Sequence, residues 1–354
     1  METDRELAAI SALNRIYGST PRKGLALLEK YGTAAAVPGL PLSGEAEQLE
    51  QLAAQGTRLV GCLSPDYPPL LKETPDHPVG LYVTGTPGRV FTRRAVAIVG
   101  TRDITSYGVQ WCRRIVRALA ETAEKPLIVS GFAIGTDIIA QAEALSCGLP
   151  TVGVMPCGPE KIYPARHETI AQRLVATPGC ALVSDYPPGT PVMAANFLRR
   201  NRIIAALADA VILIESKRKG GGLITMNYAV DYGRGTYALP GRAGDPCSEG
   251  CNLLIRRNKA EIITDTDSLL ESLGLGVLLR HPQESGLEKA ARTFGPDSTA
   301  FRILQRIRRS GSASADELCR EMNLPYSSII DTLTALQTGG WVESDLLQRF
   351  FLKS

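Results

Sequence analysis

The sequence of 354 residues lacks the motifs that identify several classes of nucleotide-dependent enzyme. No G-x-G-x-x-G follows its first long apolar run, which argues against a dinucleotide dehydrogenase, and no Walker A lysine is present. Its three histidines are scattered, and no nucleophile–base pair or carboxylate pair stands out. We therefore expect a protein without catalytic residues.

Excess charge and long apolar runs are also missing. A net charge of +3 is too balanced for a protein that wraps nucleic acid nonspecifically, so any basic site must be local. No apolar run approaches the length of a membrane span, and the acidic start METDRELAAI is unlike a signal peptide. We expect a chain that does not enter a membrane.

The eight cysteines lie mostly inside apolar runs, which suits the reducing cytoplasm. Cys247 and Cys251 form a C-x3-C motif that has no second pair and no nearby histidine. Because structural zinc needs four ligands, we expect no metal site, and no cofactor-binding motif is present.

Short apolar runs alternate with amphipathic helical patterns through the middle of the chain. Such alternation indicates an α/β fold with a doubly wound, mostly parallel sheet, which we place at residues 57–273. The expected strands end at Gly100 and Gly131 or occupy residues 151–155, 180–184, 210–214, 236–239 and 261–264. Before them, the proline-rich segment 59–83 is expected to lie extended, anchored by Tyr67 and Tyr82.

Smaller regions flank this core. Residues 1–56 predict a helical domain of the helix-hairpin-helix kind, which either contacts a DNA backbone or serves only as a packing module. Residues 274–298 show no sustained period and predict a linker. Residues 299–354 predict three helices and a hairpin, a winged helix. Its helix at 326–337 has no Lys or Arg, which favours a protein partner over DNA.

Polar and basic residues follow several of the expected strands. Because strand ends meet at one edge of a parallel sheet, we expect these segments to converge. They are Gly100–Arg102, Ser130–Asp137, Gly158–His167 and Asn196–Arg202. Guanidinium groups pair well with phosphate, and Phe197 offers a face on which an unpaired base stacks.

Each of these signals has an ordinary structural explanation. An arginine after a strand is often a surface ion pair, and a glycine-rich run is often only a tight turn. Arg199, Arg200 and Arg202 cannot all face one way on a helix, so at least one is expected to face solvent or pair with an acid. Asp137 and Asp185 are expected to cap turns rather than to catalyse a reaction. The convergence of the four segments favours a phosphate-binding edge.

The chain resembles the DNA-processing protein A family (DprA, also called Smf) over nearly its whole length. The motifs that carry the resemblance are SPDYPPLLKETPDHPVGLYVTG, AVAIVGTRDITSYG, SGFAIGTD, SDYPPGTPV, NFLRRNRIIAALADAVILIES, GGGLITMNYAVDYGRGTYALPG and GCNLLI. The resemblance implies an extended Rossmann-like core that binds single-stranded DNA and forms a homodimer. It further implies a recombination mediator that protects incoming DNA and loads the RecA recombinase during natural transformation.

The converging segments and the resemblance together predict the residues that fill these roles. For single-stranded DNA they are Gly100, Arg102, Ser130, Gly131, Gly135, Thr136, Asp137, Arg166, Phe197, Arg200, Asn201 and Arg202. For the dimer they are Asn252, Leu254, Ile255 and Ile262. The chain departs from the family pattern at Gln141, usually histidine, at Gly221, commonly serine, and at Ala165, often lysine. Arg166 is expected to stand in for that lysine.

A second interpretation is a nucleotide-handling enzyme related to the lysine-decarboxylase-like phosphoribohydrolases. These enzymes carry a P-G-G-x-G-T-x-x-E motif. The corresponding segment here, KGGGLITMNYA, keeps the glycines but lacks the glutamate. We therefore favour the DNA-binding interpretation over the enzyme.

Overall fold

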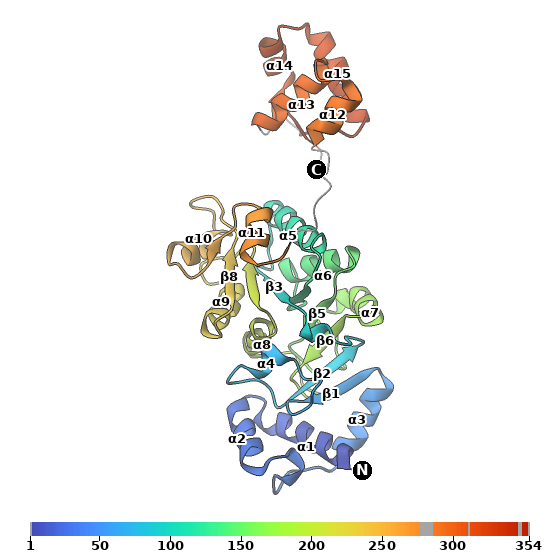
Figure 1. Cartoon of the computed structure of the whole chain (residues 1–354), viewed down its shortest axis with the longest axis vertical. Coiled ribbons are helices and arrows are strands. Elements are labelled where there is room, and N and C mark those ends of the chain that lie inside the picture. Colours follow the sequence, from blue (N-terminus) through green and yellow to red (C-terminus); the bar gives the residue numbers. More distant parts are fainter. Residues whose placement is uncertain (1, 277–285, 311, 346–348, 353–354) are drawn as a thin grey trace. The chain divides into compact units, whose positions relative to one another are not determined.

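The structure is a computed structural model that describes residues 2–276, 286–310, 312–345 and 349–352 (Figure 1). Its chain divides into two compact units, Met1–Leu278 and Leu279–Ser354. Among the described residues, no helix combines the length and the apolar character needed to cross a membrane.

The first unit is built on one nine-stranded sheet in the order β1-β2-β6-β5-β4-β3-β7-β8-β9. The seven predicted strands are all present as β3 to β9, and neighbours among them pair in parallel. This confirms the mostly parallel, Rossmann-like α/β fold. The strands are β1 (Thr57–Gly61), β2 (Gly80–Gly85), β3 (Ala95–Val99), β4 (Leu127–Ser130), β5 (Thr151–Val154), β6 (Ala181–Ser184), β7 (Ala210–Leu213), β8 (Gly235–Ala238) and β9 (Glu261–Ile262).

Strands β1 and β2 are an addition that the sequence did not predict. They pair antiparallel with each other, and β2 pairs antiparallel with β6. The expected anchors are buried: the Tyr67 hydroxyl donates to the carbonyl of Pro78 at 2.7 Å, and Tyr82 lies 2.8 Å from the Ser11 hydroxyl. The proline-rich segment 59–83 therefore contains most of two strands that extend the sheet. It is only partly extended, because the connection between the strands includes a short helix, α4 (Pro69–Lys72).

Helices cover both faces of this sheet, because alternate strand residues point to opposite sides. Val96 and Ile98 of β3 lie in one apolar cluster with helices α5, α6 and α11, and Ala97 and Val99 lie in another with α8 and α9. The helices of this unit are α1 (Glu2–Tyr17), α2 (Pro21–Tyr31), η1 (Ala34–Ala36), α3 (Glu45–Ala54), α4 (Pro69–Lys72), η2 (Val90–Thr92), α5 (Ser106–Ala120), α6 (Thr136–Ser146), η3 (Ala165–His167), α7 (Glu168–Ala176), α8 (Ala194–Ala206), α9 (Gly221–Asp231), α10 (Glu249–Arg256) and α11 (Thr266–Ser272).

The amino-terminal helices pack directly on the added strands. Leu13 of α1 shares an apolar cluster with Leu81 of β2, and the Asn14 side chain bonds both to the carbonyl and to the amide of Gly80. The predicted helical region 1–56 therefore belongs to the same compact unit as the sheet.

The described residues of the second unit form four helices and a three-stranded antiparallel sheet in the order β10-β12-β11. Its three predicted helices and terminal hairpin are present, and Ser314 and Glu317 form a capping box at the start of α14. The winged-helix identification itself stays a prediction. The elements are α12 (Gly286–Phe294), α13 (Thr299–Ser310), β10 (Ala313–Ser314), α14 (Ala315–Met322), α15 (Tyr326–Thr338), β11 (Val342–Ser344) and β12 (Arg349–Leu352).

Helix α12 falls inside the segment that was expected to be a linker. Its Ala290 is fully buried, and the ring of Phe294 lies 5.2 Å from that of Trp341. The end of the predicted linker is therefore part of the second unit's core. Residues 277–285 of the same segment lie outside the described residues.

Replacing Gln141 by leucine should raise the free energy of unfolding by about 1–3 kcal/mol. Gln141 lies in α6 and is fully buried, and neither polar atom of its amide has a hydrogen-bond partner among the described residues. Leucine removes that unsatisfied group at similar volume. Urea unfolding followed by the fluorescence of Trp111 in a Trp341→Phe background measures the change, with Gln172→Leu on an exposed position of α7 as the control. A Gln141→Leu protein less stable than the parent would show that the buried amide of Gln141 contributes to stability.

Candidate nucleic-acid interface

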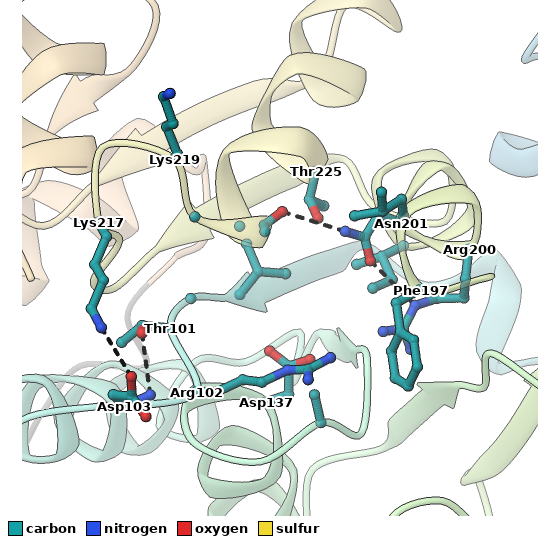
Figure 2. Close-up of a pocket in the computed structure, with 18 residues that line it drawn as sticks. Thr101, Arg102, Asp103, Asp137, Phe197, Arg200, Asn201, Lys217, Lys219 and Thr225 are labelled. Carbon is teal, nitrogen blue, oxygen red and sulfur yellow. Dashed lines mark hydrogen bonds and ion pairs between the residues drawn. The ribbon is translucent and has the colours of Figure 1, made fainter. Parts of the chain in front are cut away.

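A cavity opens where the order of the parallel strands reverses. From β3 the chain proceeds to β4 on one side of the sheet, whereas the strand on the other side is β7. The loops that follow β3 and β7 therefore diverge and leave a crevice, the usual ligand position in such sheets. The cavity has a volume of about 300 Å³ (Figure 2) and is lined by Val99, Gly100, Thr101, Arg102, Asp103, Ala133, Asp137, Phe197, Leu198, Arg200, Asn201, Ile204, Lys217, Lys219, Gly220, Gly221, Gly222 and Thr225.

The amino end of helix α9 forms one wall of this cavity. The first amides of a helix have no acceptor within the helix, so they are available to an anion. Gly221 is exposed, and a β-carbon built there would meet no atom within 4 Å. A β-carbon on Gly222 would lie 2.7 Å from the Leu213 side chain and 3.4 Å from Gly100, so glycine is needed for this close approach. These glycines leave room for a phosphate beside the helix end.

Cationic side chains outnumber carboxylates around the cavity, four against two. Arg102, Lys217 and Lys219 are exposed, and Lys217 forms an ion pair of 3.0 Å with the exposed Asp103 (Figure 2). The sequence analysis missed both lysines. The sequence contains a pattern that could have revealed them: the basic run Lys217–Lys219 lies between strand β7 and the glycines that begin α9.

Phe197 is the aromatic surface of the cavity. It lies on the first turns of α8 and is half-buried. The guanidinium carbon of Arg102 lies 4.9 Å from the centre of its ring, and the exposed Tyr163 meets it edge-on at 5.5 Å. An arginine, a phenylalanine and a tyrosine from three separate loops and helices thus form a continuous row, which suits a phosphate next to a stacked base.

The loop between β4 and α6 uses its polar groups inside the protein. The Ser130 hydroxyl donates to the carbonyl of Ile98 at 2.6 Å, and the Thr136 amide donates to the carbonyl of Thr101 at 3.1 Å. Gly135 has a φ of +83°, and a β-carbon there would lie 2.4 Å from the Thr101 oxygen. This loop therefore holds the loop that carries Arg102 in place.

Arg200 lines the cavity, but its side chain is only 3% exposed. Its Nη1 donates to the carbonyls of Gly131, at 2.5 Å, and of Val154. Burial lowers the pKa of Arg200 to about 10, and the nearby Asp137 opposes that shift. Burial likewise raises the pKa of Asp137 to about 6, opposed chiefly by Arg200. The arginine is therefore part of the cavity's floor, with its donors turned into the protein.

Arg202 lies elsewhere. Its Nη2 donates to a carboxylate oxygen of Asp185 at 2.5 Å, its Nη1 donates to the carbonyl of Asp76 at 2.5 Å, and its side chain is 4% exposed. Asp185 lies in the bend that follows β6, and its carboxylate pairs there with Arg202. Arg202 is not among the cavity residues, and neither is Arg166, which is exposed on η3.

Of the residues predicted to bind DNA, six line this cavity: Gly100, Arg102, Asp137, Phe197, Arg200 and Asn201. Four lie in the loop between β4 and α6 or at its two ends: Ser130, Gly131, Gly135 and Thr136. Gly131 leaves room for neighbouring charges, because a β-carbon there would lie 2.5 Å from Asp137 and 2.6 Å from Arg200.

The predicted dimer residues lie near one edge of the sheet. Ile262 is 46% exposed on β9, the last strand in the sheet order. Leu254 is buried, Ile255 packs against the same apolar cluster, and Asn252 bonds to the backbone of Gly241 through both polar atoms of its amide. Ile262 is the one of the four whose side chain is largely exposed.

Comparison with known proteins gives a consistent result. The family model described as DNA recombination-mediator protein A matches residues 58–274. Protein Smf of Escherichia coli is 32% identical over 278 residues, a match that covers 78% of this chain and 72% of that protein. The X-ray structure of DNA processing protein A from Streptococcus pneumoniae superposes with a TM-score of 0.64 at 27% identity, covering 76% of this chain and 97% of that one.

A structure of DNA processing protein A from Helicobacter pylori, which concerns the single-stranded DNA binding mode of that protein, also matches. It gives a TM-score of 0.55 at 30% identity and covers 61% of this chain and 95% of its own. The matched region contains every element that lines the cavity described above. The chain belongs to the DNA recombination-mediator protein A family.

Proposed function

We propose that this protein binds single-stranded DNA in the cavity between the loops that follow β3 and β7. The observation that carries the proposal is the position of the Arg102 guanidinium, 4.9 Å over the Phe197 ring and in the cavity that Lys217, Lys219 and Gly221 also line. Cations and free helix amides suit phosphates, and the adjoining ring suits an unpaired base. Single-stranded DNA binding by the Helicobacter pylori relative supports the same conclusion.

The cavity favours a single strand over a duplex. A base reaches an aromatic face only when it is not stacked within a double helix, and Phe197 lies within the cavity wall rather than on an open surface. Family membership supports a role as a recombination mediator that protects incoming DNA in the cytoplasm and loads the RecA recombinase during natural transformation.

We also propose that two copies associate through the edge that carries Ile262. An exposed isoleucine on an edge strand offers apolar area and unpaired backbone groups to a second copy. Asn252, Leu254 and Ile255 lie behind that edge. Light scattering at tens of micromolar should give the mass of a dimer, and a monomer mass would reject this assembly.

The alternative function is that of a phosphoribohydrolase. The carboxylates on the cavity wall are Asp103, which pairs with Lys217, and Asp137, which is buried beside Arg200. Neither occupies the place of the glutamate in the enzyme motif on α9. Incubation with nucleoside monophosphates should therefore release no free base, and we propose a binding protein rather than an enzyme.

Fluorescence anisotropy with labelled oligo-dT and with a duplex of equal length, at several salt concentrations, tests the function directly. We expect tighter binding to oligo-dT. Arg102→Ala should weaken that binding and make its salt dependence shallower by about 0.7 in log–log slope, because one phosphate contact is lost. Arg173→Ala, an exposed arginine on α7, is the matched control. Equal affinities of the parent and Arg102→Ala proteins would reject this site.

Removing the ring of Phe197 should weaken oligo-dT binding by about 1–3 kcal/mol without changing the salt slope, since no charge is lost. Phe197→Ala is compared with Phe197→Tyr, which keeps a ring at the same place. Circular dichroism confirms that each variant is folded. A change in salt slope as large as that of Arg102→Ala would mean that the ring acts only by positioning the guanidinium above it.

A further inference from the structure

A second cavity lies on the other side of the first turns of α8. It has a volume of about 400 Å³ and is enclosed by the end of α1 with the turn that follows it, the loop at residues 186–190, and the start of α8. The three parts are tied together. Arg15 of α1 donates to the carbonyl of Pro188 at 3.4 Å, and the Tyr186 hydroxyl donates to the carbonyl of Asn196 at 3.3 Å.

Helix α8 is the partition between the two cavities. Phe197, Arg200 and Asn201 line the first, whereas Met193, Asn196 and Arg199 line the second. This division follows from the helical period, because each successive residue turns by about 100°. A chain that leaves the first cavity past Phe197 needs to cross only the end of one helix, about 10 Å wide, to enter the second.

The second cavity has the charge that a phosphate chain requires. Its lining, all of it among the described residues, contains two arginines and no carboxylate. Arg15 already forms an ion pair with Glu45, whose Oε1 lies 2.7 Å from its Nε. Arg199 is half-buried and makes no hydrogen bond or ion pair with any residue that the structure describes. Burial raises the pKa of the nearby Asp185, and the charge of Arg199 opposes that rise only in part. Arg199 is therefore available to an anion.

The surface between the cavities is apolar. Met193 and Leu198, at the start of α8, are 54% and 50% exposed, and Tyr163 beside Phe197 is 39% exposed. Exposed thioether, aliphatic and aromatic groups give bases a surface to pack against. Exposed apolar side chains thus stand at the start of the helix that separates the two arginine-containing cavities.

We propose that the single strand bound in the first cavity continues across the start of α8 into the second cavity, where Arg199 binds a phosphate. This inference rests on the proposed function, and its occupant is the same DNA strand. The helices of residues 1–56 thereby form a wall of the DNA path. The sequence had left their role open between DNA contact and packing. This path also gives a role to Arg199, one of the three arginines of which at least one was expected to face solvent or pair with an acid.

The test is the dependence of affinity on oligonucleotide length. Parent, Arg199→Gln and Arg102→Ala proteins are titrated with oligo-dT from short lengths that fill one cavity to long lengths that reach both. Arg199→Gln should bind short oligonucleotides like the parent and long ones about tenfold more weakly. Its salt slope for long oligonucleotides should be shallower by about 0.7. Glutamine keeps most of the side chain's aliphatic stem and removes its charge.

The outcomes are distinguishable. If Arg199→Gln matches the parent at every length while Arg102→Ala is weaker, the second cavity is not on the path but the first site stands. If Arg102→Ala also matches the parent, the proposed function itself fails. An equal loss for short and long oligonucleotides would place Arg199 at the first cavity. A photoreactive benzophenone side chain in place of the exposed Ser19 should crosslink to long oligo-dT only, and crosslinking to neither length would overturn the proposal.

Discussion

Replacing Arg202 with alanine should lower the free energy of unfolding of the first unit by about 3–5 kcal/mol. The guanidinium and its partner Asp185 are both buried, 4% and 3% exposed, and lie 2.5 Å apart. Alanine leaves the Asp185 carboxylate without its cation in a site where burial already raises the pKa of that group. It also removes the bond to the carbonyl of Asp76. This loss concerns the fold and not the affinity for DNA.

The two tryptophans, Trp111 and Trp341, report on different units. In a Trp341→Phe background, urea unfolding followed by fluorescence therefore measures the first unit through Trp111. Arg173→Ala, on the surface of α7, should change stability by less than about 0.5 kcal/mol. The double variant Arg202→Met, Asp185→Leu should recover much of the loss, because it removes both buried charges. An Arg202→Ala protein as stable as the parent would show that water reaches the pair.

The parallel sheet could be predicted because its strands carry a strong local signal. Each of β3 to β9 is a short apolar run followed by glycine or a polar turn, and helical patterns separate the runs. Strand β2 was missed because Gly80–Gly85 follows several prolines and its first four residues are all buried, so no alternation marks it. Helix α12 was missed because its nine residues lie next to a segment without any period.

The arginines of α8 show why site residues are harder to predict than strands. Arg199, Arg200 and Arg202 lie within one turn of the helix, and the sequence alone does not say which partner each meets. Those partners come from distant parts of the chain: Asp185 follows β6, and Gly131 follows β4. Only the assembled sheet places them beside α8. Arg102 could be predicted because it directly follows a strand at the reversal point.

The free energy of unfolding should fall by about 3 kcal/mol between pH 4 and pH 6 because of Asp137. Burial raises the pKa of this carboxyl from 3.8 to about 6 in the folded protein. Below pH 4 both the folded and the unfolded chain hold the proton, and the full stability is present. As the pH rises, the unfolded chain loses its proton first, so unfolding becomes easier until the folded carboxyl also ionises near pH 6.

The difference in unfolding free energy between the parent and Asp137→Asn proteins isolates this carboxyl from others that titrate, Asp185 among them. That difference, parent minus variant, should decline from pH 4 to pH 6 and then stay level. Asp265 provides a control of opposite sign, because hydrogen bonds from the Ser268 amide and hydroxyl lower its pKa. The parent minus Asp265→Asn difference should instead rise with pH over the acid range. A level difference for Asp137→Asn across pH 4–6 would mean that Arg200 holds the Asp137 carboxylate ionised throughout, and that the cavity floor is a permanent ion pair.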